Sequence, residues 1–146
     1  MAGEAIVVVG TPKTLEANGA STGNNVVTQA NDGTYSIVAD GTNFPDAKFV
    51  FSGTFATAPT ENSSIGLLAR PINIDGTNDS EVPEATRATY FVGAFTLNNV
   101  TTTQYAELIA RDVPWEAEYY IFNNNSNQTL SAGWTLKVTP FSYKAA

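Results

Sequence analysis

The sequence predicts an all-β domain: an antiparallel sandwich of two sheets, jelly-roll-like, with eight or nine strands. Three observations predict it. The 146 residues include 19 Thr and 14 Asn but little Glu, Lys, Leu or Met, a bias that disfavours helices. Turn signals rich in Asn, Asp and Gly recur along the chain. Short runs of β-branched and aromatic residues lie between these signals, as in sandwiches and barrels.

The length is that of one domain, residues 1–146, and neither a linker nor an internal repeat divides the chain. A domain of this size buries roughly 68–70% of the surface that its unfolded chain exposes. Because the sequence contains no Cys, no disulfide contributes to its stability. We therefore expect a single hydrophobic core.

Nine segments have the composition of strands. In chain order they are residues 6–9, 26–29, 35–38, 47–55, 64–74, 88–97, 104–109, 118–123 and 135–141. Several alternate between apolar and polar residues, which indicates one buried and one exposed face. The alternating side chains expected to share buried faces are Phe49, Phe51, Phe55, Phe91, Phe95, Leu97, Trp134, Leu136 and Val138.

Residues 101–112 fit two secondary structures. As a helix, capped by a threonine, they would carry a stripe of Tyr105, Leu108 and Ile109. As a strand, Tyr105 and Ile109 would share one face and Leu108 would lie on the other. The β-rich context favours the strand.

The chain is acidic, with a formal charge of −7, and no two of its seven Lys and Arg residues are adjacent. Nucleic acids and anionic membranes attract clustered basic residues, so we expect neither partner. No segment approaches the ~20 apolar residues of a spanning helix. The apolar run near the N-terminus has five residues and no basic flank, so we expect no signal peptide and synthesis in a cytoplasm.

Most familiar active sites are excluded by composition. Without His and Cys, neither a Ser-His-Asp triad nor a Cys-His pair can form, and no phosphate-binding glycine motif occurs. Two carboxylates suffice for glycoside hydrolysis, and the candidate pairs are Glu107 with Asp112 and Glu116 with Glu118. Solvated acids at strand ends explain these pairs more simply, so we expect no enzyme and no cofactor.

Residues 75–81 (DGTNDSE) offer oxygen ligands of the kind that Ca²⁺ prefers, at Asp75, Asn78, Asp79 and Glu81. Their spacing does not match the EF-hand loop. The alternative is an acidic connection between two strands, and we assign no metal site.

Two groups of residues are candidates for contact with a ligand or partner. Trp115 follows Pro114 in an expected loop, and Trp115 and Tyr119, together with Tyr90 and Tyr120, could stack on sugars. Ile6 and Val8 lie in the apolar N-terminal strand, whose open edge could pair with the sheet of another chain.

Several segments of the C-terminal half carry a family resemblance. They are ATYFVGAF (88–95), TTTQY (101–105), RDVP (111–114), YIFNNN (120–125) and TLSAGWTLKVTPFSY (129–143). Over roughly residues 86–143, which contain these segments, the chain resembles small virion proteins of tailed bacteriophages of the capsid cement or decoration type.

The resemblance implies a jelly-roll-like sandwich on the outside of the capsid, assembled as a dimer or trimer and bound to the major capsid protein. It implies a virion structural protein without catalytic residues. The alternative function for the same fold is a carbohydrate-binding β-sandwich of the receptor-binding or tail-fibre type.

Overall fold

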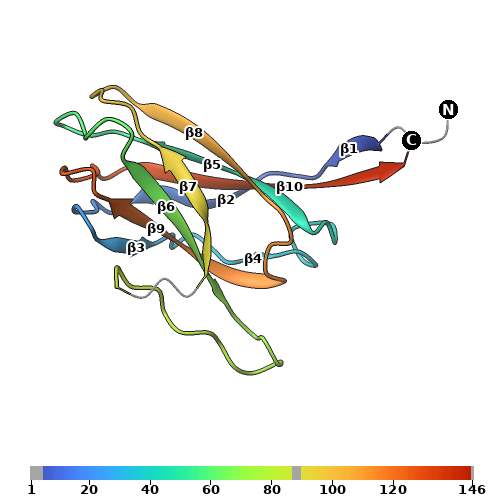
Figure 1. Ribbon diagram of the computed structural model, residues 1–146. Coiled ribbons are helices and arrows are strands. Elements are labelled where there is room, and N and C mark those ends of the chain that lie inside the picture. The colour runs from blue at the N-terminus through green and yellow to red at the C-terminus, as the bar shows by residue number, and fades with distance from the viewer. Residues whose placement is uncertain (1–4, 87–89, 146) are drawn as a thin grey trace.

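The computed structural model describes residues 5–86 and 90–145, and it is a sandwich of two antiparallel sheets (Figure 1). The described residues contain ten strands and no helix, which confirms the all-β prediction. The strands are β1 (Ala5–Val9), β2 (Lys13–Gly19), β3 (Val27–Gln29), β4 (Tyr35–Ser36), β5 (Asp46–Gly53), β6 (Ser64–Pro71), β7 (Phe91–Thr96), β8 (Gln104–Ala110), β9 (Glu116–Asn124) and β10 (Trp134–Ala145). No helix long and apolar enough to cross a membrane occurs in the described part.

The strand order is that of a jelly roll. In the first sheet, β1 and β2 both pair with β10, which is followed by β5 and β8. In the second sheet, β3 and β4 both pair with β9, which is followed by β6 and β7. When β1 with β2, and β3 with β4, each count as one position, the sheets interleave as the two Greek keys of this fold do.

The core lies between the two sheets. Phe51, Trp134 and Leu136 enter it from the first sheet, and Leu67 and Ile121 from the second, and all five are fully buried. Burying a side chain of this size contributes roughly 1.5–3 kcal/mol. The expected alternation in segments 47–55 and 134–139 is confirmed.

Some expected boundaries were wrong. Strand β2 was not predicted, and the segment expected over residues 35–38 is a strand only at Tyr35–Ser36. The start of the segment expected over residues 88–97 lies partly outside the described residues. Residues 104–110 are a strand, as favoured.

Phe91 does not face the core with Phe95. A register shift between Leu67 and Leu68 of β6 pairs Leu67 with Gly93 and Leu68 with Phe91, which is a bulge in β7. Because the extra residue reverses the alternation, Phe91 is largely exposed while Phe95 stays buried.

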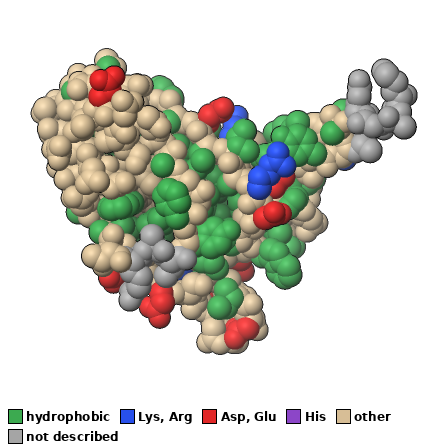
Figure 2. Space-filling view, in the orientation of Figure 1, with side chains coloured by type: hydrophobic (Ala, Val, Ile, Leu, Met, Phe, Trp, Pro, Cys, Tyr) green, Lys and Arg blue, Asp and Glu red, His purple; other side chains and the backbone are tan. Residues whose placement is uncertain are grey.

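The two ends of the sandwich differ in chemistry. At one end, asparagines join the turns: the Asn125 N–H donates to Asn25 Oδ1 and the Asn127 N–H to Asn24 Oδ1, both at 3.0 Å. The opposite end carries β1 and the last residues of β10, which extend away from the body (Figure 1). In Figure 2 the Asn-rich end shows mostly uncharged polar surface, whereas hydrophobic and charged side chains gather toward the extension.

Candidate binding surfaces at the ribbon end

The extension is a two-stranded ribbon, formed by β1 and residues 141–145 of β10. Val9 pairs with Phe141 and Ala5 with Ala145. The pairing of β10 with β5 ends at Phe141, so beyond that residue no third strand covers the ribbon in the described chain. Isolated two-stranded ribbons are marginally stable in water, which makes this segment a natural place for a partner to add to.

One face of the ribbon is apolar and open to solvent. Val7, Val9 and Tyr143 are 54%, 62% and 44% exposed. With Ile109 of β8 and the nearly buried Phe141, they line a hollow of about 260 Å³ that also includes Thr139 and Lys48. Side chains this apolar are usually covered in a soluble protein when they gather on one face.

The outer edge of β1 pairs with no other strand in the described residues. The Gly10 N–H donates to the carbonyl of Pro140 at 2.8 Å, which places Gly10 in a hydrogen-bonded pair with β10. Antiparallel strands alternate such pairs, so the N–H and C=O groups of Ala5, Val7 and Val9 point away from β10. The edge carries no Lys, Pro or bulge, the usual protections of an exposed edge.

Arg111 fastens the base of the ribbon to the loop after β8. Its guanidinium carbon lies 4.7 Å from the centre of the Tyr143 ring, a cation–π geometry. Its Nη1 is 3.9 Å from Asp46 Oδ2, while Asp46 Oδ1 accepts the N–H of Asp112 at 3.1 Å. The apolar face therefore has an ordered, charged border.

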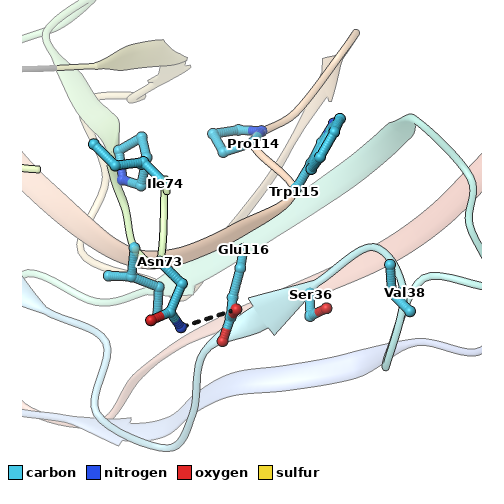
Figure 3. Close-up of a pocket in the computed structure, with 9 residues that line it drawn as sticks. Ser36, Val38, Asn73, Ile74, Pro114, Trp115 and Glu116 are labelled. Carbon is cyan, nitrogen blue, oxygen red and sulfur yellow. Dashed lines mark hydrogen bonds between the residues drawn. The ribbon is translucent and has the colours of Figure 1, made fainter. Parts of the chain in front are cut away.

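A second surface, the Trp115 groove, lies at the start of β9, away from the Asn-rich end where β9 finishes. Figure 3 shows its lining residues. It has a volume of about 540 Å³ and does not share a lining residue with the hollow on the ribbon. Its lining comes from β4 and the residues after it, from the end of β6, and from the start of β9. The lining residues are Ser36, Val38, Pro71, Ile72, Asn73, Ile74, Pro114, Trp115 and Glu116.

The backbone around Trp115 is fixed although its side chain is 80% exposed. The Ile37 N–H donates to the Trp115 carbonyl at 2.9 Å, and the Ile72 N–H donates to the Glu116 carbonyl at 3.0 Å. These bonds tie two other segments of the chain to residues 115 and 116, where β9 begins. The indole is thus held at the surface by the chain itself.

Two polar side chains meet in the groove. Asn73 Nδ2 donates to Glu116 Oε2 at 3.1 Å, as the dashed line in Figure 3 shows. Asn73 has a φ of 52°, in the left-handed region that Asn tolerates better than most residues. Its own N–H donates to Asp79 Oδ1 at 3.0 Å, which orders the loop at this point.

Arg70, next in sequence to the groove residue Pro71, connects the loop after β6 to β9. Its Nε donates to the Ser80 carbonyl at 2.8 Å and its Nη1 to Glu118 Oε2 at 3.1 Å, while Nη2 lies 3.8 Å from Asp79 Oδ2. The hydrogen bond with Glu118 raises the pKa of the guanidinium further. The groove wall therefore has a rigid support.

Trp115 and Tyr119, both expected at the surface, differ in exposure. Trp115 is exposed and lines the groove, whereas Tyr119 is fully buried against Phe49, with ring centres 4.9 Å apart. The expectation of a surface role for Tyr119 is wrong, because it points inward from β9. Burial raises the pKa of its hydroxyl well above the usual value.

The other residues that we expected to contact a ligand or partner also include both buried and exposed side chains. Tyr120 is nearly buried and donates to Glu118 Oε2 at 3.0 Å, whereas Tyr90 is partly exposed. Ile6 is exposed and Val8 half-buried, and both lie on the face of the ribbon opposite Val7. Val38, Asn73 and Ile74 were not foreseen as groove residues, and no signal in the sequence joins them to Trp115.

The carboxylates of the candidate pairs interact with different side chains. Glu107 Oε2 lies 3.7 Å from Lys48 Nζ on the outer face of the first sheet. Glu116 accepts from Asn73, and Glu118 pairs with Arg70. The structure therefore gives Glu116 and Glu118 different partners.

Residues 75–81 form a self-contained turn. Asp75 Oδ1 accepts the N–H of Asn78 at 2.8 Å, and its Oδ2 accepts the Asn78 side-chain amide at 2.6 Å. These hydrogen bonds lower the pKa of Asp75 to about 2. In the described residues, no group of three or more acidic side chains is arranged to hold a metal ion.

No protein-family model and no curated protein matches the chain. Among solved structures, it is similar to the decameric BFDV capsid protein, with a TM-score of 0.33 and 11% identity. The alignment covers 94% of this chain and 96% of that one. A TM-score this low does not establish a common fold.

Proposed function

We propose that this chain is a structural protein of a bacteriophage particle, of the cement or decoration type, which binds the capsid shell and associates with copies of itself. The observation that carries the proposal is the projecting ribbon with its open apolar face and unprotected edge. Water disfavours such a face, and a partner that covers it gains the corresponding hydrophobic free energy.

The difference between the ends of the sandwich supports a docking role. The Asn-rich end satisfies its turns with its own side chains and presents a polar surface. A protein that coats a particle needs one end that binds and another that remains solvated. The ribbon end has the binding chemistry, so we place the major capsid protein there.

The resemblance of residues 86–143 to phage virion proteins is the reason for proposing a phage particle. A jelly roll by itself is compatible with capsid subunits and with lectins, so the fold alone does not choose between them. The absence of His and Cys removes most catalytic groups, in keeping with a structural role.

The edge of β1 suits pairing with a second copy. In an antiparallel arrangement centred on Val7, each Val7 would face its counterpart, and each Ile6 would face Val8 of the other copy. The result is a continuous sheet of β10, β1 and the same two strands of the second chain. No charged side chain lies between residues 5 and 9, so like charges do not meet along this line.

Co-sedimentation with shells of the phage that encodes the chain tests the docking proposal. We expect the wild type to sediment with shells, and the double variant Val7→Lys/Val9→Lys to bind about tenfold more weakly or not at all, because an ammonium group must be desolvated there. Val26→Lys is the matched control, an exposed valine at the Asn-rich end. Wild-type protein that does not sediment, or equal binding by both lysine variants, would overturn the proposal.

Light scattering tests self-association. Val7→Pro removes an N–H on the open edge while the hydrogen bonds to β10 remain, so it should shift the protein from oligomer to monomer. A wild-type chain that is monomeric at high concentration would remove the self-association part and leave docking to be judged by sedimentation.

A further inference from the structure

The Trp115 groove has the chemistry of a small-molecule site, separate from the docking face. Trp115 is one of two tryptophans, and the other, Trp134, is fully buried with its Nε1–H donated to the Ala20 carbonyl at 2.8 Å. The indole of Trp115 is left in water although its backbone is held by two other segments. Exposure of so large an apolar ring in a concave site calls for a ligand that covers it.

We propose that the Trp115 groove binds a neutral hexopyranose unit of a carbohydrate. The C–H face of such a ring is apolar and flat enough to lie on the indole, while its rim carries hydroxyl groups. Val38 and Ile74, both exposed, extend the apolar lining on the segments flanking Trp115. The volume of about 540 Å³ lies within the range of roughly 300–1,000 Å³ typical of ligand pockets.

The polar groups of the groove fit neighbouring sugar hydroxyls. One hydrogen bond joins the Asn73 side chain to Glu116, so within the described residues the side-chain oxygen Oδ1 of Asn73 and Glu116 Oε1 remain open as acceptors. The second proton of the Asn73 amide is a donor. Adjacent hydroxyls need both a donor and an acceptor, and an amide beside a carboxylate provides this combination.

Charge restricts the class of sugar. Glu116 is the charged side chain in the groove lining, and that lining contains neither Lys nor Arg. Arg70, behind the wall, is already paired with Glu118 and Asp79. A carboxylated or sulfated sugar would therefore meet uncompensated negative charge, and a neutral one would not.

Size favours a sugar over a protein partner. A stable protein interface buries about 800 Å² on each partner, usually across a broad surface. The groove is a local hollow bounded by three short segments of the chain. A protein contact at Trp115 remains a distinct outcome of the experiment below.

A glycan array screened with the full-length protein comes first. It should carry neutral glucose-, galactose- and mannose-containing oligosaccharides and sialylated ones as anionic comparators. We expect binding to at least one neutral glycan and none to its sialylated counterpart. Titration of the bound glycan should change the fluorescence of Trp115, while the buried Trp134 serves as the internal reference.

Variants assign the binding to the groove. Trp115→Ala should abolish binding, Trp115→Phe should retain part of it, and Asn73→Ala should weaken it about tenfold through the lost hydrogen bonds. Tyr105→Ala is the matched control, because Tyr105 is an exposed aromatic residue on the outer face of β8. Thermal unfolding of each variant verifies that the sandwich is intact.

Two results would overturn the proposal. One is the absence of any neutral glycan that binds the array or alters the fluorescence. The other is loss of shell binding in Trp115→Ala without any glycan binding by the wild type, which would make the groove a protein contact. Neither result bears on the ribbon variants, so failure here is separable from failure of the docking function.

Discussion

Gly19 and Trp134 face each other across the β2–β10 pair, and the indole of Trp134 occupies the space that a side chain at position 19 would need. A Cβ at Gly19 would overlap the ring atoms Cε2 and Cδ2 directly. The ring is fully buried, and its Nε1–H donates to the carbonyl of Ala20, the residue directly after β2, at 2.8 Å. One glycine thus makes room for the largest side chain of the core.

Gly19→Ala should therefore destabilise the fold. Because the core is close-packed, Trp134 or the β2 backbone must move to accept the methyl group, at a cost of about 1–3 kcal/mol. Chemical denaturation measures the loss of unfolding free energy. Gly66→Ala is the matched control, since a Cβ at Gly66 in β6 would meet only ordinary contacts, at 3.4 Å from Phe122. Equal stability of the two variants would contradict the packing described for Trp134.

The same contact explains why β2 was missed. Residues 13–19 (KTLEANG) have weak β-propensity and end in Asn-Gly, which is typical of a turn. They form a strand because they pair with β10 and pack against the indole of Trp134. Tertiary packing overrides local preference here, whereas the alternation in β5 and the start of β10 was strong enough to be predicted.

The candidate sites were predictable only where a local sequence signal marked them. Pro114 and the break in alternation indicated that Trp115 lies in a loop, and Ile6 and Val8 were found from the apolar N-terminal run. Tyr119 was misjudged because its orientation depends on the register of β9 with β6. Asn73 joins Trp115 only through the order of strands in the second sheet, which periodicity does not reveal.

Tyr119→Phe should leave the protein as stable as the wild type or make it more stable. The Tyr119 hydroxyl is buried and has no hydrogen-bond partner among the described residues. An unsatisfied buried group of this kind costs about 1–3 kcal/mol, and phenylalanine keeps the contact with Phe49. The measurement is thermal or chemical unfolding.

Tyr120→Phe is the natural comparison for this change. The Tyr120 hydroxyl donates to Glu118 at 3.0 Å, so its removal should lower stability by about 1 kcal/mol. If Tyr119→Phe loses as much stability as Tyr120→Phe, the Tyr119 hydroxyl has a partner after all.

Asn78→Ala should raise the pKa of Asp75. The hydrogen bonds from the Asn78 side chain and backbone, followed by that from the Thr77 backbone, lower this pKa from 3.8 to about 2. Because the pKa of Asp75 is lower in the folded state, its ionised carboxylate stabilises the turn at a pH above the ordinary pKa. This stabilisation is lost as the pH falls through about 2. Carboxyl titration by NMR should give a value closer to 3.8 in the variant.

Thr77→Val controls for the titration of Asp75. It removes only the long hydroxyl contact of 3.4 Å and keeps the backbone N–H, so it should shift the pKa of Asp75 little. A similar shift in both variants would mean that Asn78 does not determine the acidity of Asp75.

Arg111→Ala should loosen the ribbon without disturbing the core. Arg111 links Tyr143 to Asp46, so it holds the ribbon against the loop that follows β8. A cation–π contact at an exposed site contributes about 0.5–1 kcal/mol, which corresponds to roughly two- to fivefold faster exchange of the Ser142 and Lys144 amides, the neighbours of Tyr143 that face β1. Hydrogen exchange at Phe51 and Ile121, in the core strands, should stay unchanged.

Arg111→Lys separates stacking from charge in this contact. Lysine keeps a positive charge near Asp46 but lacks the planar group that lies on the ring, so exchange should be intermediate between wild type and Arg111→Ala. Wild-type protection of the Ser142 and Lys144 amides in both variants would show that pairing with β1 alone orders the ribbon. If Arg111 orders the ribbon, the variants with faster amide exchange should also bind shells more weakly, because a looser ribbon loses more conformational freedom on docking.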